Sequence, residues 1–169
     1  MKIFNEKIPD LKALYVKELR LLLSAEEMIA IKTQYLADSA TDPDLRETLR
    51  KEVDQSEARA ARVREILQHA SDEVGEVKCK VVYALFDEAE DAVKNSEYDG
   101  VRDAAVLAAA QRVKHYEIAS YGSLREFART LDRKQDAQWL DEAIFDEGNA
   151  ELAFGKFAER INSTALRAA

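Results

Sequence analysis

A glutamate stands in the apolar stripe of a long helix predicted over residues 101–131. Apolar residues recur there at the helical period of about 3.6 residues. Glu117 falls on the side formed by Val106, Ala110, Val113, Leu124 and Leu131. An ionised carboxylate among apolar side chains is costly in free energy unless it is paired, hydrogen-bonded or bound to a cation. The fold of this chain must therefore supply a partner for Glu117.

Two other predicted helices also carry acids in their apolar stripes. The helix over residues 9–39 places Glu26 among its Leu and Ile residues, and the helix over residues 134–162 places Glu147 and Glu151 one turn apart. A single inward acid is most simply a helix-edge residue in contact with water. Several inward acids on different helices favour a shared cation instead.

In the predicted helix over residues 43–70, the sequence pattern does not decide which acid points inward. Asp54 and Glu57 lie beside each other on one flank of its apolar stripe, and Glu52 lies on the opposite flank. We take Asp54 and Glu57 as candidate ligands. Whether Glu52 rather than Asp54 completes the set is undecided at this point.

The pattern of helices predicts an all-α fold. Only five Gly and two Pro occur among 169 residues, and the helix formers Ala, Leu, Glu, Lys and Arg are abundant. A break over residues 71–75 precedes a shorter amphipathic helix over residues 77–95, which suits a crossover connection. We expect one domain over residues 1–169, a four-helix bundle with an additional short crossover helix.

The net charge and the composition limit the classes of partner and the types of metal site that we expect. The formal charge of −8 argues against a nucleic-acid backbone or an anionic membrane surface as partner. No apolar run approaches the ~18 residues that span a bilayer, and no signal peptide is recognised, so a cytoplasmic protein is expected. With one cysteine, Cys79, and two histidines, any metal site must consist mostly of carboxylates.

The chain resembles the YciE/YciF-type family of bacterial ferritin-like stress proteins. The resemblance is carried by HYEIASYG from His115 to Gly122, VRDAA from Val101 to Ala105, ELR at 18–20, SAE at 24–26 and Cys79. It implies a rubrerythrin-like bundle, often dimeric, with a dinuclear iron-type site and a role in stress. Glu26, Glu117 and Glu147 match the family's acids most closely.

Some positions depart from that family pattern. Lys114 stands where family members usually have Glu, and Asp54 and Glu57 replace a Glu and a His or Glu. Phe145 interrupts the acidic run of the last helix. Because Lys114 precedes Glu117 by three residues, the two side chains can meet on one helix face. Its ammonium could then replace one positive charge of a metal.

Two hypotheses of function follow, and the residues leave open whether the protein is an enzyme. The first is a carboxylate-bridged dinuclear iron or manganese protein that reacts with dioxygen or peroxide, or holds iron, since hard oxygen ligands suit these ions. Its candidate metal ligands are Glu26, Asp54, Glu57, Glu117, Glu147 and Glu151. The second is a non-catalytic structural or interaction protein with an empty or degenerate site. Under both hypotheses a homodimer is expected, because the central helix is apolar on more than one face.

Overall fold

The computed structural model describes residues 7–71 and 77–167, and every regular element in these ranges is an α-helix. The five helices are α1 (Leu11–Ser39), α2 (Pro43–Ala70), α3 (Lys80–Lys94), α4 (Asp99–Thr130) and α5 (Lys134–Arg167). The all-α prediction is confirmed. The predicted break over residues 71–75 lies outside the described residues except for Ser71.

The helix ends follow local signals in the sequence. The carboxylate of Asp10 accepts a hydrogen bond from the Ala13 amide at 2.8 Å, and the carboxylate of Asp42 accepts one from the Leu45 amide at 3.0 Å. Each acid thus caps a helix start, α1 and α2 respectively. Asp132, with φ 56°, takes the left-handed conformation in the short turn between α4 and α5. The largest deviation from the sequence prediction is α5, which continues past residue 162 to Arg167.

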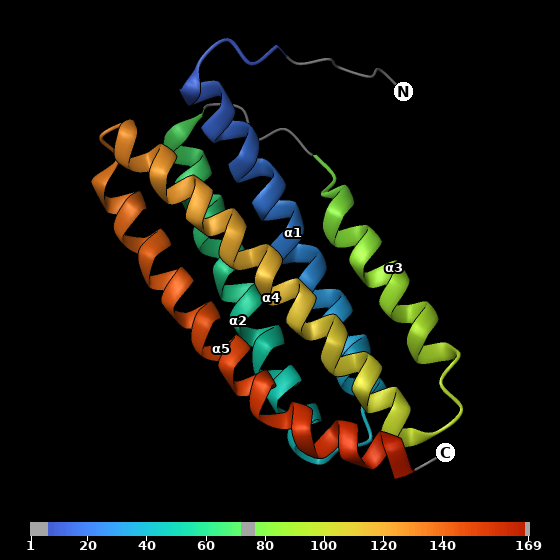
Figure 1. The fold of residues 1–169 in the computed structure, drawn as a ribbon. Helices are drawn as coiled ribbons and strands as arrows, with labels where there is room; N and C mark the ends of the chain where they lie inside the picture. Colours follow the sequence, from blue (N-terminus) through green and yellow to red (C-terminus); the bar gives the residue numbers. More distant parts are fainter. Residues whose placement is uncertain (1–6, 72–76, 168–169) are drawn as a thin grey trace.

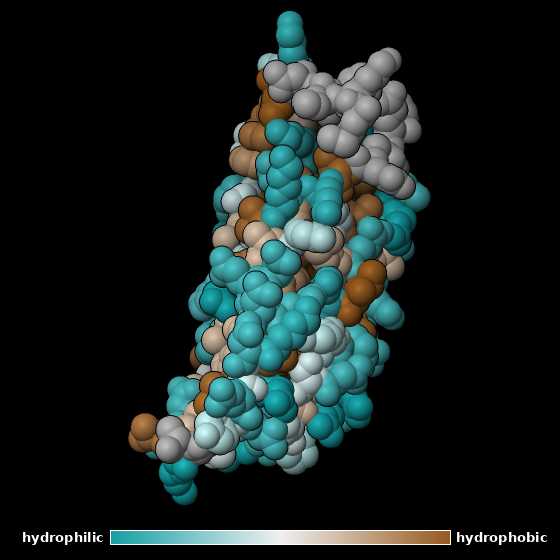
Figure 2. Space-filling model, turned by 90° about the vertical axis from the view of Figure 1, so that its right-hand side faces the viewer, coloured by the Kyte–Doolittle hydropathy of each residue, from teal (hydrophilic) through white to brown (hydrophobic). Residues whose placement is uncertain are grey.

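Two antiparallel hairpins and one crossover helix form the molecule (Figure 1). The α1–α2 hairpin packs against the α4–α5 hairpin, and α3 runs along α1 and α4 in the connection between them. This is the predicted four-helix bundle with a short crossover helix. On the face shown in Figure 2, hydrophobic residues form small separate patches in a largely hydrophilic surface. None of the helices described is long and apolar enough to cross a lipid bilayer.

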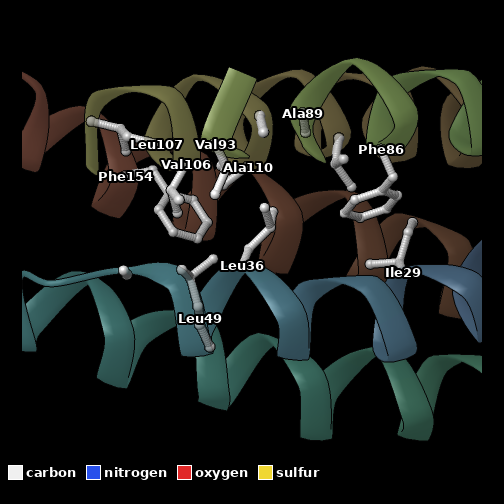
Figure 3. Close-up of a cluster of buried hydrophobic side chains, with 14 of the residues drawn as sticks. Ile29, Leu36, Leu49, Phe86, Ala89, Val93, Val106, Leu107, Ala110 and Phe154 are labelled. Atoms are coloured by element: carbon white, nitrogen blue, oxygen red, sulfur yellow. The ribbon is translucent and has the colours of Figure 1, made fainter. Parts of the chain in front are cut away.

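The hydrophobic core consists of two separate clusters. The first includes Ile29, Leu49, Phe86, Val106 and Phe154, several of which are labelled in Figure 3, and it receives side chains from all five helices. The second lies toward the other end of the bundle and includes Tyr15, Leu19, Val63, Tyr121 and Leu140. On each of the four long helices, buried charged residues occupy the sequence positions between the two clusters. The polar centre of the bundle is therefore enclosed by apolar packing at both ends.

A buried acid holds the lower end of the bundle in Figure 1 together. Asp103 of α4 accepts hydrogen bonds from the Thr41 amide and hydroxyl, both at 2.6 Å, and from the Asp42 amide at 2.9 Å. Arg160 of α5 pairs with the Asp42 carboxylate. The loop between α1 and α2 is thus tied to both helices of the other hairpin.

Candidate functional site

Four glutamates are buried at the centre of the bundle, one from each long helix. Glu26 of α1, Glu117 of α4 and Glu147 of α5 are 0% exposed, and Glu52 of α2 is 5% exposed. Two cations, Arg59 of α2 and Lys114 of α4, are buried with them. We call these six residues the central ion cluster.

Lys114 joins three of the four carboxylates. Its Nζ lies 2.5 Å from Glu52 Oε2, 2.7 Å from Glu147 Oε2 and 2.9 Å from Glu117 Oε2. The three acids come from α2, α5 and α4 respectively. One ammonium at the centre therefore connects three helices.

Arg59 lies close to all four carboxylates. Its Nη1 lies 2.7 Å from Glu147 Oε1, and its Nε lies 3.4 Å from Glu26 Oε2. Its Nη2 lies 3.6 Å from both Glu52 Oε2 and Glu117 Oε1. The planar guanidinium presents several donors in a fixed geometry, which suits contact with several acids at once.

Two neutral side chains complete the polar contacts. The Tyr121 hydroxyl donates to Glu26 Oε1 at 2.6 Å, and Arg59 Nη2 donates to the Ser56 hydroxyl at 3.1 Å. The Tyr121 ring packs edge-on against Trp139, with centroids 5.8 Å apart. Tyr121 thus contacts the central ion cluster through its hydroxyl and belongs to the second apolar cluster through its ring.

The central ion cluster contains four acids and only two cations. Burial shifts the pKa values of several of these groups. Burial raises the pKa of Glu117 and of Glu147 to about 7, although Lys114 and Arg59 oppose the shift. Burial also raises the pKa of Glu26. For Lys114, burial disfavours the charge, but Glu117, Glu147 and Glu52 outweigh it and raise the pKa above its usual value. Both cations therefore stay charged at neutral pH, while Glu117 and Glu147 exchange protons near pH 7.

Charge rather than directed hydrogen bonding holds several of these oxygens. Among the described residues, both carboxylate oxygens of Glu117, Oε2 of Glu52 and Oε1 of Glu147 are buried without a hydrogen bond of good geometry. The same oxygens lie within 2.5 to 3.6 Å of the two cations. Buried acids of this kind depend strongly on their cations, because no other group compensates for the loss of water.

The two hairpins contribute equal sets of charges. The α1–α2 hairpin supplies Glu26, Glu52 and Arg59, and the α4–α5 hairpin supplies Glu117, Glu147 and Lys114. Each set contains two acids and one cation. Each cation contacts acids of the opposite hairpin, so the central ion cluster is complete only when the hairpins pack together.

The structure brings only some of the predicted site residues together. Glu26, Glu117 and Glu147 point inward as their stripes predicted, whereas their role as metal ligands stays a prediction. Asp54 and Glu57 are exposed on α2. Their positions are turned outward because Glu52 and Ser56 occupy the core side of that helix. Glu52, and not Asp54, is the acid of α2 that faces the core, while a role of either acid as a metal ligand stays a prediction.

Glu151 is also outside the central ion cluster. Its side chain is 25% exposed, and its Oε1 lies 3.8 Å from Nε2 of His115, which is 68% exposed. The two residues form a contact between α4 and α5 at the surface. Glu151 is therefore placed as a surface partner of His115.

Arg59 is the residue that the sequence prediction missed, whereas Glu52 is an open alternative to Asp54 in that prediction. The core side of α2 follows alternating steps of four and three residues, through Leu45, Leu49, Glu52, Ser56, Arg59, Val63 and Ile66. Val53, the apolar neighbour of Glu52, is only half-buried, whereas Glu52 faces the core. Because long charged side chains usually reach solvent, the arginine did not appear as a core residue. The four-three spacing was the signal that could have identified it.

The residues present do not fit a dinuclear metal centre. An ion bound between Glu52, Glu117 and Glu147 would coincide with the ammonium of Lys114, and the guanidinium of Arg59 fills the remaining side. No group of three or more His, Cys, Asp or Glu side chains in ranges 7–71 and 77–167 is arranged to hold a metal ion. The acids of the cluster already have two cations of the chain itself as partners.

Comparisons with known proteins agree with this fold. Protein YciF of Escherichia coli (strain K12) is 30% identical over 130 residues, covering 76% of this chain and 78% of that protein. The crystal structure of the E. coli stress protein YciF matches with a TM-score of 0.87 and 26% identity, covering 92% of this chain and 98% of that one. The structure of YcfI from Rhodopseudomonas palustris, provisionally described as a structural protein, matches with a TM-score of 0.85 and 26% identity, covering 90% and 98%.

The family model described as "Domain of unknown function (DUF892)" matches residues 10–167. This range spans all five helices. The resemblance to YciE/YciF-type proteins drawn from the sequence motifs is confirmed. The chain belongs to the DUF892 family.

Proposed function

We propose that this protein is a non-catalytic structural bundle of a stress response, whose buried acids are neutralised by its own cations. The observation that carries the proposal is the position of Lys114 Nζ, within 2.9 Å of carboxylates from three helices. Arg59 adds a second positive charge beside all four acids. A bundle stabilised in this way requires no metal ion to hold its centre together.

The similar proteins support both parts of this proposal. One is described as a stress protein and the other, provisionally, as a structural protein. We extend these two descriptions to the present chain because the match covers at least 90% of its length in both structures. Under this proposal the stable scaffold is the functional property, and partners contact its surface.

The competing hypothesis is a dinuclear iron or manganese protein that reacts with dioxygen or peroxide, or holds iron. Inward acids on four helices favour it, since bundles of this type build such sites from facing glutamates. It requires Lys114 and Arg59 to leave the centre and two metal ions to enter. The four acids would then be paired with metal ions alone. The contacts by which Lys114 joins three helices would be lost.

Metal analysis separates the two hypotheses. The protein is purified without chelator, its iron and manganese are measured, and its thermal unfolding is followed with EDTA, with Fe²⁺ and with Mn²⁺. We expect substoichiometric metal, no visible absorbance, and the same melting temperature under all three conditions. Two metal ions per chain with a melting temperature that EDTA lowers would overturn the proposal and support the dinuclear hypothesis.

We also propose that the chain forms a homodimer in the cytoplasm. Phe145 and Leu152, seven residues apart on one side of α5, are 70% and 63% exposed. Large apolar side chains exposed on one helix face favour burial against another molecule. Light scattering should show a dimer for wild type, and a monomer from wild type would contradict this part.

A further inference from the structure

We infer that two copies of this chain pack antiparallel through the outer face of α5, so that each large apolar side chain of one copy meets a glycine of the other. This inference rests on the homodimer of the proposed function and deepens it by naming the surface. The surface consists of Phe145, Gly148, Leu152 and Gly155, which we call the α5 stripe. These residues follow one another in steps of three, four and three, so they lie on one face of the helix.

The α5 stripe lies on the side of α5 that faces away from the bundle. Phe145 is 70% exposed and Leu152 is 63% exposed, and Gly155 is exposed as well. Helix α5 packs against α4 and less extensively against α2, and no helix in the described part of the chain covers its outer side (Figure 1). Two large apolar side chains on an uncovered helix face form a surface suited to another helix.

The two glycines of the α5 stripe are not explained by packing within one chain. Glycine weakens a helix interior relative to alanine, and both positions lie well inside α5. Among the residues that the structure describes, nothing outside the surrounding helix lies within 4 Å of a Cβ built at Gly148 or Gly155. At Gly100, by contrast, a Cβ would lie 3.0 Å from the backbone of Ala165. Gly100 is therefore needed for packing within the chain, whereas Gly148 and Gly155 leave room for atoms of another molecule.

A second copy fits the α5 stripe because the stripe is complementary to itself. In an antiparallel pair of α5 helices centred near Ala150, Phe145 of one copy lies opposite Gly155 of the other. Leu152 likewise lies opposite Gly148. Each glycine gives the facing side chain room and lets the two backbones approach. A parallel pair would instead set Phe145 against Phe145 and glycine against glycine, which crowds one layer and leaves a void in the next. The antiparallel pair is also closed by a twofold axis, as in most homodimers.

The charges beside the α5 stripe are complementary in the same arrangement. Glu142 and Lys156 are exposed on one flank of the stripe. Glu142 accepts a hydrogen bond from Gln138 at 3.1 Å, but neither Glu142 nor Lys156 forms an ion pair with another described residue. The antiparallel pair brings Glu142 of each copy near Lys156 of the other, and flanking charges of this kind set the orientation of paired helices. The order of aromatic residue, glycine and charge along α5 therefore favours a second copy as the partner.

The ends of the α5 stripe limit the strength of the contact. Asp141 and Glu159 lie one turn beyond Phe145 and Gly155, and in the antiparallel pair the two acids lie opposite each other. Asp141 is already paired with Arg125 at 2.7 Å, which offsets part of their repulsion. The apolar contact is thus only about three turns long. Because small interfaces are weak, we expect a dimer that dissociates on dilution.

Analytical ultracentrifugation of the full chain over a concentration series tests this surface. The double variant Gly148→Gln with Gly155→Gln fills the space opposite the large side chains with a polar residue that favours helix. It should dimerise more weakly than wild type by about tenfold or more. Its melting temperature at low concentration should stay the same or rise, since the space is open in a single chain. A wild-type dimer that the double variant leaves unchanged would overturn this inference and leave the homodimer standing. Wild type that is monomeric at every concentration would overturn the homodimer as well.

Charge reversal gives a second test that does not depend on the glycines. Glu142→Lys alone sets lysines opposite each other in the antiparallel pair, and Lys156→Glu alone sets glutamates opposite each other. Each variant should dimerise about fivefold more weakly than wild type, and high salt should reduce the difference. An equimolar mixture of the two should regain the wild-type affinity, because the mixed pair has opposite charges at both contacts. Glu88→Lys, an exposed charge reversal on α3, is the matched control and should behave as wild type. A mixture that dissociates as readily as its components would overturn the antiparallel arrangement.

Discussion

Two buried acids on α4, Asp103 and Glu117, are stabilised in opposite ways. The Asp103 carboxylate accepts three hydrogen bonds from Thr41 and Asp42, two of them from backbone amides. Glu117 has no hydrogen bond of good geometry among the described residues, and it faces the side-chain cations Lys114 and Arg59. The first acid is held by neutral donors of a loop, and the second by the charges of two buried side chains.

The difference shows which buried acid can be changed by solution conditions. Backbone amides do not titrate and cannot leave, so the setting of Asp103 is permanent as long as the loop is folded. The setting of Glu117 depends on protonation and on two side chains that a substitution can remove. Asp103 therefore contributes to the stability of the fold. The surroundings of Glu117 can change with protonation or substitution, as a present or former functional site requires.

The largest expected effect is that of Lys114→Ala in the absence of metal. Three carboxylates would lose their shared cation, and removal of one partner from a buried ion pair costs about 3–5 kcal/mol. Urea unfolding at pH 7.5 with EDTA measures the loss. The control is Lys51→Ala, which removes an exposed ion pair with Glu47 and should change stability by less than about 0.5 kcal/mol. Equal effects of the two substitutions would show that Lys114 is not needed for stability.

Asp103→Asn tests the other side of the comparison. An amide in place of the carboxylate weakens three charge-assisted hydrogen bonds, so we expect a loss of about 2–3 kcal/mol. Urea unfolding of wild type and variant measures the loss. Asp99→Asn, at an exposed residue of the same helix that pairs with Arg102, is the control. A stability loss no larger than that of Asp99→Asn would contradict the role of Asp103 at this end of the bundle.

The pH dependence should come from the central ion cluster. The pKa of Glu117 and of Glu147 is about 7 in the folded chain, above their ordinary value of 4.5. The folded state therefore binds more protons than the unfolded state between about pH 4.5 and 7, and stability falls as pH rises through this window. The loss approaches completion only above about pH 8, because half of each group is still protonated at a pH equal to its pKa.

Glu117→Gln should remove part of this pH dependence. At pH 8 the variant should be more stable than wild type, on the order of 1–2 kcal/mol, because one buried negative charge is gone. The advantage should disappear by about pH 5, where wild-type Glu117 is protonated. Urea unfolding of both proteins across pH 5–8 measures the difference. A variant less stable than wild type at pH 8 would show that the Glu117 charge is needed.

The smallest expected effects are those of Asp54→Asn and Glu57→Gln. Both side chains are exposed on α2, and exposed substitutions usually change stability by less than about 0.5 kcal/mol. Neither substitution should alter metal content or the pH profile. Metal analysis and urea unfolding check both expectations. A loss of bound metal in either variant would return these residues to the list of ligands.

The sequence predicted the helices and three of the four inward acids for clear physical reasons. Asp42 followed by Pro43 marks the start of α2, and the capping bond from Leu45 is observed. Glu26 and Glu117 stand among Leu, Ile and Val at the helical period, so their direction could be determined from one helix alone. Such features depend only on neighbours along the chain.

The pairing within the central ion cluster could not be predicted in the same way. Whether Arg59 extends to solvent or folds inward depends on acids from three other helices, which are far away in the sequence. The choice between neighbouring stripes on α2 likewise depends on the helix crossing, and a small rotation exchanges Glu52 for Val53. Lys114 was noticed because it departs from a family pattern, but its contacts with Glu52 and Glu147 required the packed structure.

The equal sets of charges on the two hairpins also fix the register in which the hairpins pack against each other. Sliding one hairpin along the other by a single turn would separate Lys114 from Glu52 and Arg59 from Glu147, the shortest ion pairs of the central ion cluster that cross between the hairpins. The apolar clusters at the two ends of the central ion cluster contain no buried charges that must meet specific partners, so they would tolerate such a shift more easily. Misaligned pairs would leave acids buried without cations, which is far more costly than imperfect apolar packing. The same charges that neutralise the centre therefore select one alignment of the bundle among several that hydrophobic packing alone would allow.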